Sequence, residues 1–143
     1  MTRDEVIAES RQWIGTPWSH QACAKGAGVD CIHLIAGIAR AFGRPEVELF
    51  FATSEYHSYG RHPDPVMMFG GCDSLLDRIA IADALPADVI VMRCGKHPMH
   101  FGLLSASDRM IHAWLGAGRV IEQRIDAKWR ARFVRAYRLR GIA

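Results

Sequence analysis

The chain has 143 residues, half of them hydrophobic and 23% charged, and its formal net charge is +3. This length suits one domain with its own core, and this composition excludes a disordered chain. So small a net charge does not indicate a nucleic-acid-binding protein. No apolar run approaches the ~18 residues of a membrane span, and the first residues lack the apolar core of a signal peptide. Synthesis in the cytoplasm, without a signal peptide, is therefore expected.

Two helices are predicted in the first third of the chain. Residues 3–14 carry apolar side chains at helical spacing, with Thr2 or Asp4 near the start. After a glycine-rich loop over 19–29, Asp30 precedes a second helix over 31–42, which Gly43 ends. The segment 44–72 is rich in proline and glycine and is expected to be irregular. A short helix capped by Asp73 is expected after it.

Beyond residue 88 the apolar pattern changes from a helical period to strict alternation, which predicts strands. They are expected over 88–93, 100–105, 109–114 and 118–122, followed by a short helix near 126–131 and a last strand near 133–139. Helices followed by consecutive strands predict an α+β fold, with N-terminal helices packed on a mostly antiparallel C-terminal sheet. Residues 1–143 are expected to form a single domain.

Cys31 is the strongest candidate nucleophile. It lies in the first turn of a predicted helix, where the helix dipole and unpaired backbone N–H groups favour a thiolate and an oxyanion. Asp30 opposes ionisation of the thiol, so a pKa in the middle or upper part of the range of about 3.5–7.5 is expected. The remaining cysteines form no Cys-x-x-Cys pair and are interpreted as buried apolar residues: Cys23, Cys72 and Cys94.

Two histidines lie at positions that suit a catalytic base and its orienting partner. His100 begins one predicted strand, and His112 lies in the middle of the next. Opposed side chains on neighbouring antiparallel strands are about 5 Å apart. His112 is therefore expected to hold one nitrogen of His100 and leave the other for Cys31. A metal site built from His97, His100 and His112 is a weaker alternative.

Five short motifs resemble the NlpC-type cell-wall cysteine peptidase family, and in particular its short branch found in phages and gene-transfer particles. They follow one another in the order of that family, and the resemblance extends from about residue 3 to residue 138. The motifs are Trp13–Trp18, Gly28–Cys31, Pro86–Ile90, His100–Leu104 and Met110–Ala113.

The resemblance implies a papain-like fold and an enzyme that needs no metal or organic cofactor. It implies Cys31 as nucleophile, His100 as base and His112 as the polar orienter. The implied reaction is hydrolysis of amide bonds in peptidoglycan stem peptides, next to D-glutamate, through a cysteine acyl-enzyme. Asp30 would face the free amino end of the substrate. Trp18 would form an aromatic wall where the family has a tyrosine.

The chain also departs from the family pattern, since Ile32-His33 replaces a pair of small residues after the cysteine. Tyr59, in the irregular segment, is expected to flank the substrate groove. Two alternatives stay open: an amidase or acyltransferase with the same residues, and a degenerate structural component of a phage-tail-like particle. The expected partners are stem peptides and, in a phage-like particle that acts on the cell wall, other particle proteins.

Overall fold

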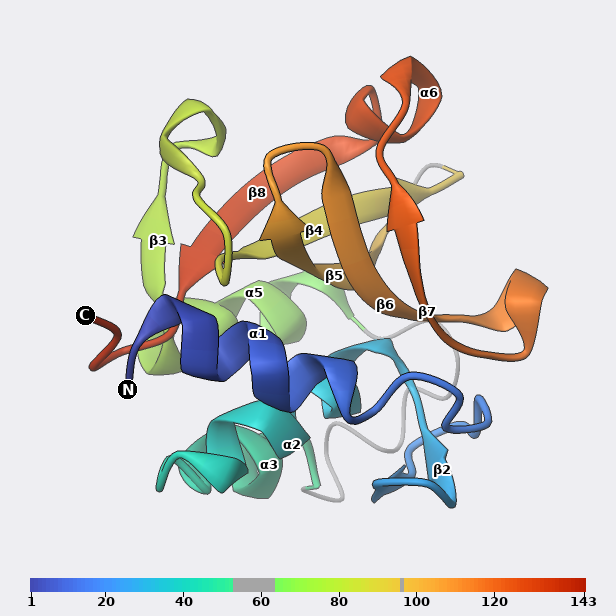
Figure 1. The fold of residues 1–143 in the computed structure, drawn as a ribbon. Helices are drawn as coiled ribbons and strands as arrows, with labels where there is room; N and C mark the ends of the chain where they lie inside the picture. The colour runs from blue at the N-terminus through green and yellow to red at the C-terminus, as the bar shows by residue number, and fades with distance from the viewer. Residues whose placement is uncertain (53–63, 96) are drawn as a thin grey trace.

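A computed structural model describes residues 1–52, 64–95 and 97–143 of the chain. Its first half is mainly helical and its second half mainly strands (Figure 1). The helices are α1 (Arg3–Arg11), α2 (Cys31–Ala41), α3 (Glu46–Phe51), α5 (Pro65–Leu75) and α6 (Ala127–Arg130). The strands are β1 (Cys23–Ala24), β2 (Gly28–Val29), β3 (Asp77–Ile79), β4 (Val89–Cys94), β5 (His97–Ala106), β6 (Arg109–Trp114), β7 (Arg119–Arg124) and β8 (Phe133–Arg138).

The central feature is a six-stranded antiparallel sheet in the order β3-β8-β4-β5-β6-β7. The helices α1, α2, α3 and α5 gather on one side of this sheet, and α2 packs directly against β5 and β6 (Figure 1). Apolar side chains of α2 and of the facing sheet surface form the main core, and a smaller core lies on the opposite face. This arrangement confirms the α+β fold predicted from the sequence.

The first two helices begin at the predicted caps. The Thr2 hydroxyl accepts from the amide of Glu5 at 3.2 Å, and the Glu5 carboxylate accepts from the amide of Thr2 at 2.7 Å. This reciprocal pair is a capping box, which satisfies two amides at the start of α1. Trp13, just after α1, is buried against Gly37 of α2, where a Cβ would have no room. The two helices are thereby locked together, which fixes the direction of α2.

The segment between α2 and β4 is more regular than its composition predicts. α3 and α5 occupy part of it, and residues 53–63 lie outside the described residues. The Asp64 side chain accepts from the amide of Val66 and Pro65 stands in the first turn, which favours a helix start. Gly71 faces Phe50 of α3, with no space between them for a side chain. The glycine thus permits close helix packing within α5, and does not break the helix.

The prediction of a short helix capped by Asp73 is wrong. Asp73 lies inside α5, and Asp77–Ile79 forms the edge strand β3, which pairs with β8. That pairing joins residues about sixty positions apart, so the local apolar pattern does not reveal it. The loop expected over 19–29 likewise contains the two-residue strands β1 and β2, which pair with each other.

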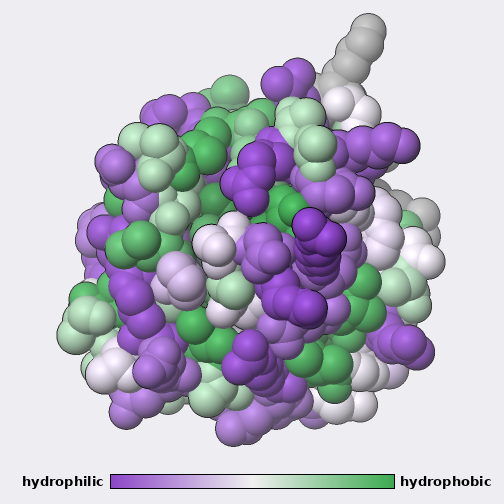
Figure 2. Space-filling model, turned by 45° about the horizontal axis from the view of Figure 1, so that its top comes forward, coloured by the Kyte–Doolittle hydropathy of each residue, from purple (hydrophilic) through white to green (hydrophobic). Residues whose placement is uncertain are grey.

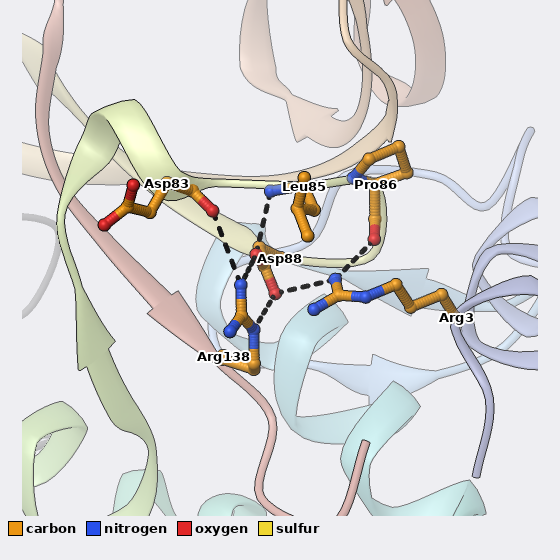
Figure 3. A network of polar contacts seen from close by, with 6 residues as sticks. All are labelled: Arg3, Asp83, Leu85, Pro86, Asp88 and Arg138. Carbon is orange, nitrogen blue, oxygen red and sulfur yellow. Dashed lines mark hydrogen bonds and ion pairs between the residues drawn. The ribbon is translucent and has the colours of Figure 1, made fainter. Parts of the chain in front are cut away.

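Asp88 links the start of β4 to segments near both ends of the chain (Figure 3). Its carboxylate is fully buried and accepts from Arg3, at 3.1 Å, and from two nitrogens of Arg138, at 2.9 and 2.7 Å. The amide of Leu85 donates to the same carboxylate at 2.9 Å. A buried carboxylate with this many donors is well satisfied. The network fixes where β4 begins and so positions its neighbour β5.

Ala87, next to Asp88, has a backbone φ of +78° and is fully buried. An L-residue pays roughly 1–2 kcal/mol for this left-handed conformation, whereas glycine adopts it freely. We expect Ala87→Gly to raise the free energy of unfolding by about 1 kcal/mol, measured by urea denaturation. The control Ala136→Gly, in β8, should lower it. A lower urea midpoint for Ala87→Gly would contradict the expected strain.

None of the described helices is long and apolar enough to cross a membrane. On the face drawn in Figure 2, hydrophilic side chains are interspersed with apolar ones. Several arginines in and after β8 are paired with carboxylates: Arg135 with Asp73, Arg138 with Asp88, and Arg140 with Asp77. These ion pairs therefore connect β8 and the residues after it to α5, β3 and the start of β4.

Candidate active site

Cys31 is the first residue of α2, and Asp30 caps the helix by accepting from the amide of His33 at 3.0 Å. The side chain of Cys31 is partly buried. The backbone amides of Phe101 and Ile32 interact with its sulfur and favour the thiolate. Phe101 directly follows His100 in β5, so the candidate nucleophile lies against the strand that carries the candidate base.

The thiol of Cys31 is nevertheless neutral in the resting protein. Burial raises its pKa from an ordinary 9.0 to about 12, and the charge of Asp30 acts in the same direction. The amides of Phe101 and Ile32 oppose this shift but do not outweigh it. The prediction that the helix start lowers the pKa of Cys31 and favours its thiolate is therefore wrong for the resting site. Desolvation raises this pKa by more than the helix N-terminus lowers it. A base must take the thiol proton before the sulfur can act as a nucleophile.

A chain of short polar contacts joins His100, His112 and Gln123. His100 Nε2 lies 2.6 Å from His112 Nδ1, and His112 Nε2 lies 2.7 Å from Oε1 of Gln123. An amide oxygen only accepts, so His112 Nε2 carries its proton and its Nδ1 accepts from His100 Nε2. This relay leaves Nδ1 of neutral His100 unprotonated, which is the state that a general base requires.

Sequence reasoning missed Gln123. In the sheet, Gln123 of β7 is paired with Met110 of β6, two residues from His112 and therefore on the same face. Gln123 could have been found by comparing the alternating pattern of β6, which carries His112, with that of the next strand, β7.

Two tryptophans, also missed from the sequence, enclose the histidines. The ring of Trp114 lies 5.2 Å from that of His100, and the ring of Trp129 lies 5.3 Å from that of His112, between ring centres. Burial lowers the pKa of His100 and of His112 below the ordinary 6.5, and their mutual repulsion lowers that of His100 further. Both imidazoles are therefore neutral at neutral pH.

Gly102 lies in β5, two residues after His100, and packs near His112. A Cβ at this position would come within 3.0 Å of Met92 and 3.2 Å of the sulfur of Met110. It would also stand 3.7 Å from Cβ of His112. The glycine of the His100–Leu104 motif thus leaves room for the side chains of Met92 and Met110, while its distance to His112 is an ordinary packing contact.

The carboxylate of Asp30 contacts neighbouring polar groups inside the protein. Beside the amide of His33, its Oδ1 contacts Nδ1 of the His33 ring at 2.7 Å, and its Oδ2 accepts from the amide of Gln21 at 2.7 Å. Asp30 and His33 are both buried. His33 therefore holds the carboxylate that caps α2. A role for Asp30 toward the amino end of a substrate stays a prediction.

Of the two aromatic residues expected to line a substrate groove, the structure describes Trp18. Its amide donates to the carbonyl of Gly118 at 2.9 Å, and it forms an isolated bridge with Val29, two residues before Cys31. Trp18 thus lies beside the segment that leads into α2. Tyr59 lies outside the described residues, and its expected role stays a prediction.

Among the residues that the structure describes, no group of three or more histidine, cysteine or acidic side chains is arranged to hold a metal ion. The alternative metal site includes His97, whose side chain lies outside that description.

The buried histidines predict a dependence of stability on pH. Their pKa values are lower in the folded than in the unfolded protein, so the stability present above pH 6.5 is lost as pH falls. Each contributes a slope of about 1.4 kcal/mol per pH unit where only the unfolded chain is protonated. In urea denaturation below about pH 6, the slope for His112→Gln should be smaller than that of the wild type by this amount. Equal slopes would show that His112 is protonated in the folded state.

The sequence matches no family model and no curated protein. Solved structures do match the fold. The NlpC/p60 domain of the peptidoglycan hydrolase SagA has a TM-score of 0.66 and 16% identity, over 97% of this chain and 100% of that chain. An NlpC/p60 family protein from Bacillus cereus ATCC 10987 has a TM-score of 0.69 and 17% identity, over 97% of this chain and 40% of that one.

The peptidoglycan hydrolase RipB from Mycobacterium tuberculosis has a TM-score of 0.61 and 16% identity, over 95% of this chain and 63% of that one. The chain thus spans the whole SagA domain but less than two thirds of the other two proteins. At these identities the likeness establishes the fold, which is that of NlpC/p60 domains.

Proposed function

We propose that this protein is an NlpC-type cysteine peptidase that hydrolyses amide bonds in peptidoglycan stem peptides. One observation carries the proposal. Cys31 begins α2 with its sulfur at the backbone amide of Phe101, the residue that follows His100 in β5, and His100 contacts His112, which in turn contacts Gln123. Two of the structural neighbours are described as peptidoglycan hydrolases, which supports this substrate class. The position of the bond, next to D-glutamate, follows from the resemblance of the motifs.

In the proposed acylation, His100 Nδ1 takes the thiol proton of Cys31 as the sulfur attacks the carbonyl carbon of the amide. The backbone amides at the start of α2 favour the negative charge that develops on the carbonyl oxygen. His112 accepts from His100 Nε2 throughout and so favours the imidazolium. When the intermediate collapses, His100 gives its proton to the leaving amine, the C–N bond breaks and a thioester remains.

In the proposed hydrolysis step, His100 takes a proton from water, and the resulting nucleophile attacks the thioester. The carbon–sulfur bond then breaks, the sulfur of Cys31 regains a proton from His100, and the carboxylic acid leaves. Every proton in this cycle moves between Cys31, His100, water and substrate. The residues described here therefore suffice for the chemistry without an added oxidant, reductant or cofactor.

The direct test is mass spectrometry of purified muropeptides after incubation with the wild-type protein and with Cys31→Ser. We expect stem peptides to be cut by the wild type only, with a new carboxyl end on D-glutamate. Cys23→Ser is a matched control, because Cys23 is also a partly buried free cysteine and the mechanism does not use it. Equal cleavage by wild type and Cys31→Ser would overturn the proposal.

The resting protonation states also predict the pH profile. The pKa of His100 is lowered, so His100 stays an unprotonated base well below pH 6.5, and activity should persist there. Since the Cys31 thiol is neutral as well, no imidazolium is lost at alkaline pH. We expect kcat/KM for a stem peptide to be nearly level from about pH 5 to 8. A bell centred in this range would instead indicate a thiolate–imidazolium pair.

A further inference from the structure

A groove of about 560 Å³ lies beside the candidate site. It is lined by the end of β4, the end of β6 and the segment between α6 and β8. We call it the arginine groove, after two of its lining residues: Arg93, Cys94, Gly95, Trp114, Ala131 and Arg132. The amide of Arg93 donates to the carbonyl of Arg132 at 2.9 Å. This backbone hydrogen bond joins the two walls of the groove that carry the arginines.

The arginine groove carries positive charge that the protein does not neutralise. Among residues 1–52, 64–95 and 97–143, no carboxylate lies within ion-pair distance of Arg93 or Arg132. The arginines that do have such partners are Arg3, Arg11, Arg40, Arg44, Arg135, Arg138 and Arg140. The guanidinium of Arg132 lies 4.4 Å from the ring centre of Trp129, a contact that orients the cation and leaves its charge in place.

The same groove adjoins the candidate catalytic residues. Trp114 lines it, and the Trp114 ring lies 5.2 Å from that of His100. Arg132 is close enough for its charge to contribute to the lowered pKa of His100. Cys94, also in the lining, is within electrostatic reach of Cys31. A molecule in the groove would therefore contact Trp114, whose ring also neighbours that of His100.

We propose that the arginine groove is a carboxylate subsite of this active site. The inference rests on the proposed function and specifies its substrates as peptides with a free carboxylate close to the scissile amide. Guanidinium groups bind carboxylates through paired, charge-assisted hydrogen bonds. An otherwise identical peptide with a carboxamide at that position would leave both cations without an anionic partner, so it binds more weakly.

The kinetic test uses two stem peptides that differ only in a carboxylate or a carboxamide beside the cleaved bond. The wild type should show a KM roughly 10–100-fold lower for the carboxylate, since one charge-assisted contact is worth about 1.5–3 kcal/mol. Arg132→Gln should bring the two KM values together. Arg78→Gln removes the same charge from β3, at the far edge of the sheet, and should preserve the difference. An undiminished difference in Arg132→Gln overturns the inference.

A second measurement does not depend on peptide cleavage. In a Cys94→Ser background, Cys31 is alkylated with iodoacetate or iodoacetamide, and mass spectrometry follows that residue alone. Relative to free glutathione, Cys31 should favour the anionic reagent by about tenfold at low salt, and Arg132→Gln or high salt should remove the preference. If this preference holds but no peptide is cut, the peptidase proposal fails and the subsite stands. If peptides are cut and Cys31 behaves like glutathione, the subsite fails and the peptidase stands.

Discussion

Replacing His100 by alanine is expected to lower kcat/KM for a stem peptide by about 10²–10⁴-fold, the usual contribution of a positioned general base. The resting thiol of Cys31 is neutral, so without His100 no group of the relay can take its proton. His112→Ala should have a smaller effect, because His112 orients the base and stabilises its charge without receiving the thiol proton. Steady-state kinetics of the two variants, at equal folded fractions, measure this difference.

The effect of Gln123→Ala makes the comparison sharper. Gln123 sets the tautomer of His112 through the 2.7 Å contact with Nε2, and touches neither Cys31 nor His100 in the relay. Its loss should lower the rate less than either histidine substitution. If His112→Ala proves more damaging than His100→Ala, the roles of base and orienter are reversed.

Asp88→Asn is expected to have the largest effect on stability, a loss of about 3–5 kcal/mol in the free energy of unfolding. The buried carboxylate meets two guanidinium groups, from Arg3 and Arg138, and an uncharged amide leaves both without their anion (Figure 3). Guanidine or urea denaturation followed by circular dichroism measures the change.

Asp77→Asn is the matched control. Asp77 also pairs with an arginine, Arg140, at 3.2 Å, but its side chain is 60% exposed. Exposed pairs contribute about 0–1 kcal/mol, so this variant should be nearly as stable as the wild type. A similar loss in both variants would mean that the burial of Asp88 does not determine the strength of its network.

The helix of Cys31 and the consecutive strands from β4 to β8 were predictable, because their signals are local. Asp30 caps a strongly apolar helix, and β4 and β6 are short runs with four consecutive buried residues each, which is typical of strands covered on both faces. β3 was not predictable, since the strand it pairs with, β8, lies far along the chain. α5 was missed because Gly71 signals a break, while its actual role is to admit Phe50.

At the candidate site, sequence reasoning predicted one contact that the structure shows, but not the protonation states of the residues. The positions of His100 and His112 in two consecutive predicted strands predicted their contact, which the structure shows at 2.6 Å. Burial has no local signature in the sequence, so the raised pKa of Cys31 was missed. The same holds for Asp30, whose partners His33 and Gln21 depend on how the loop before α2 folds back.

The two ends of the described chain meet. The amide of Ala143 donates to the carbonyl of Met1 at 2.9 Å, and Figure 1 shows the N- and C-terminal marks side by side. A domain whose ends lie together tolerates circular permutation and insertion into a surface loop of another protein. A polypeptide continuing from either residue would leave the domain at the same place. A domain of this kind can therefore be attached to a larger protein through one connection point.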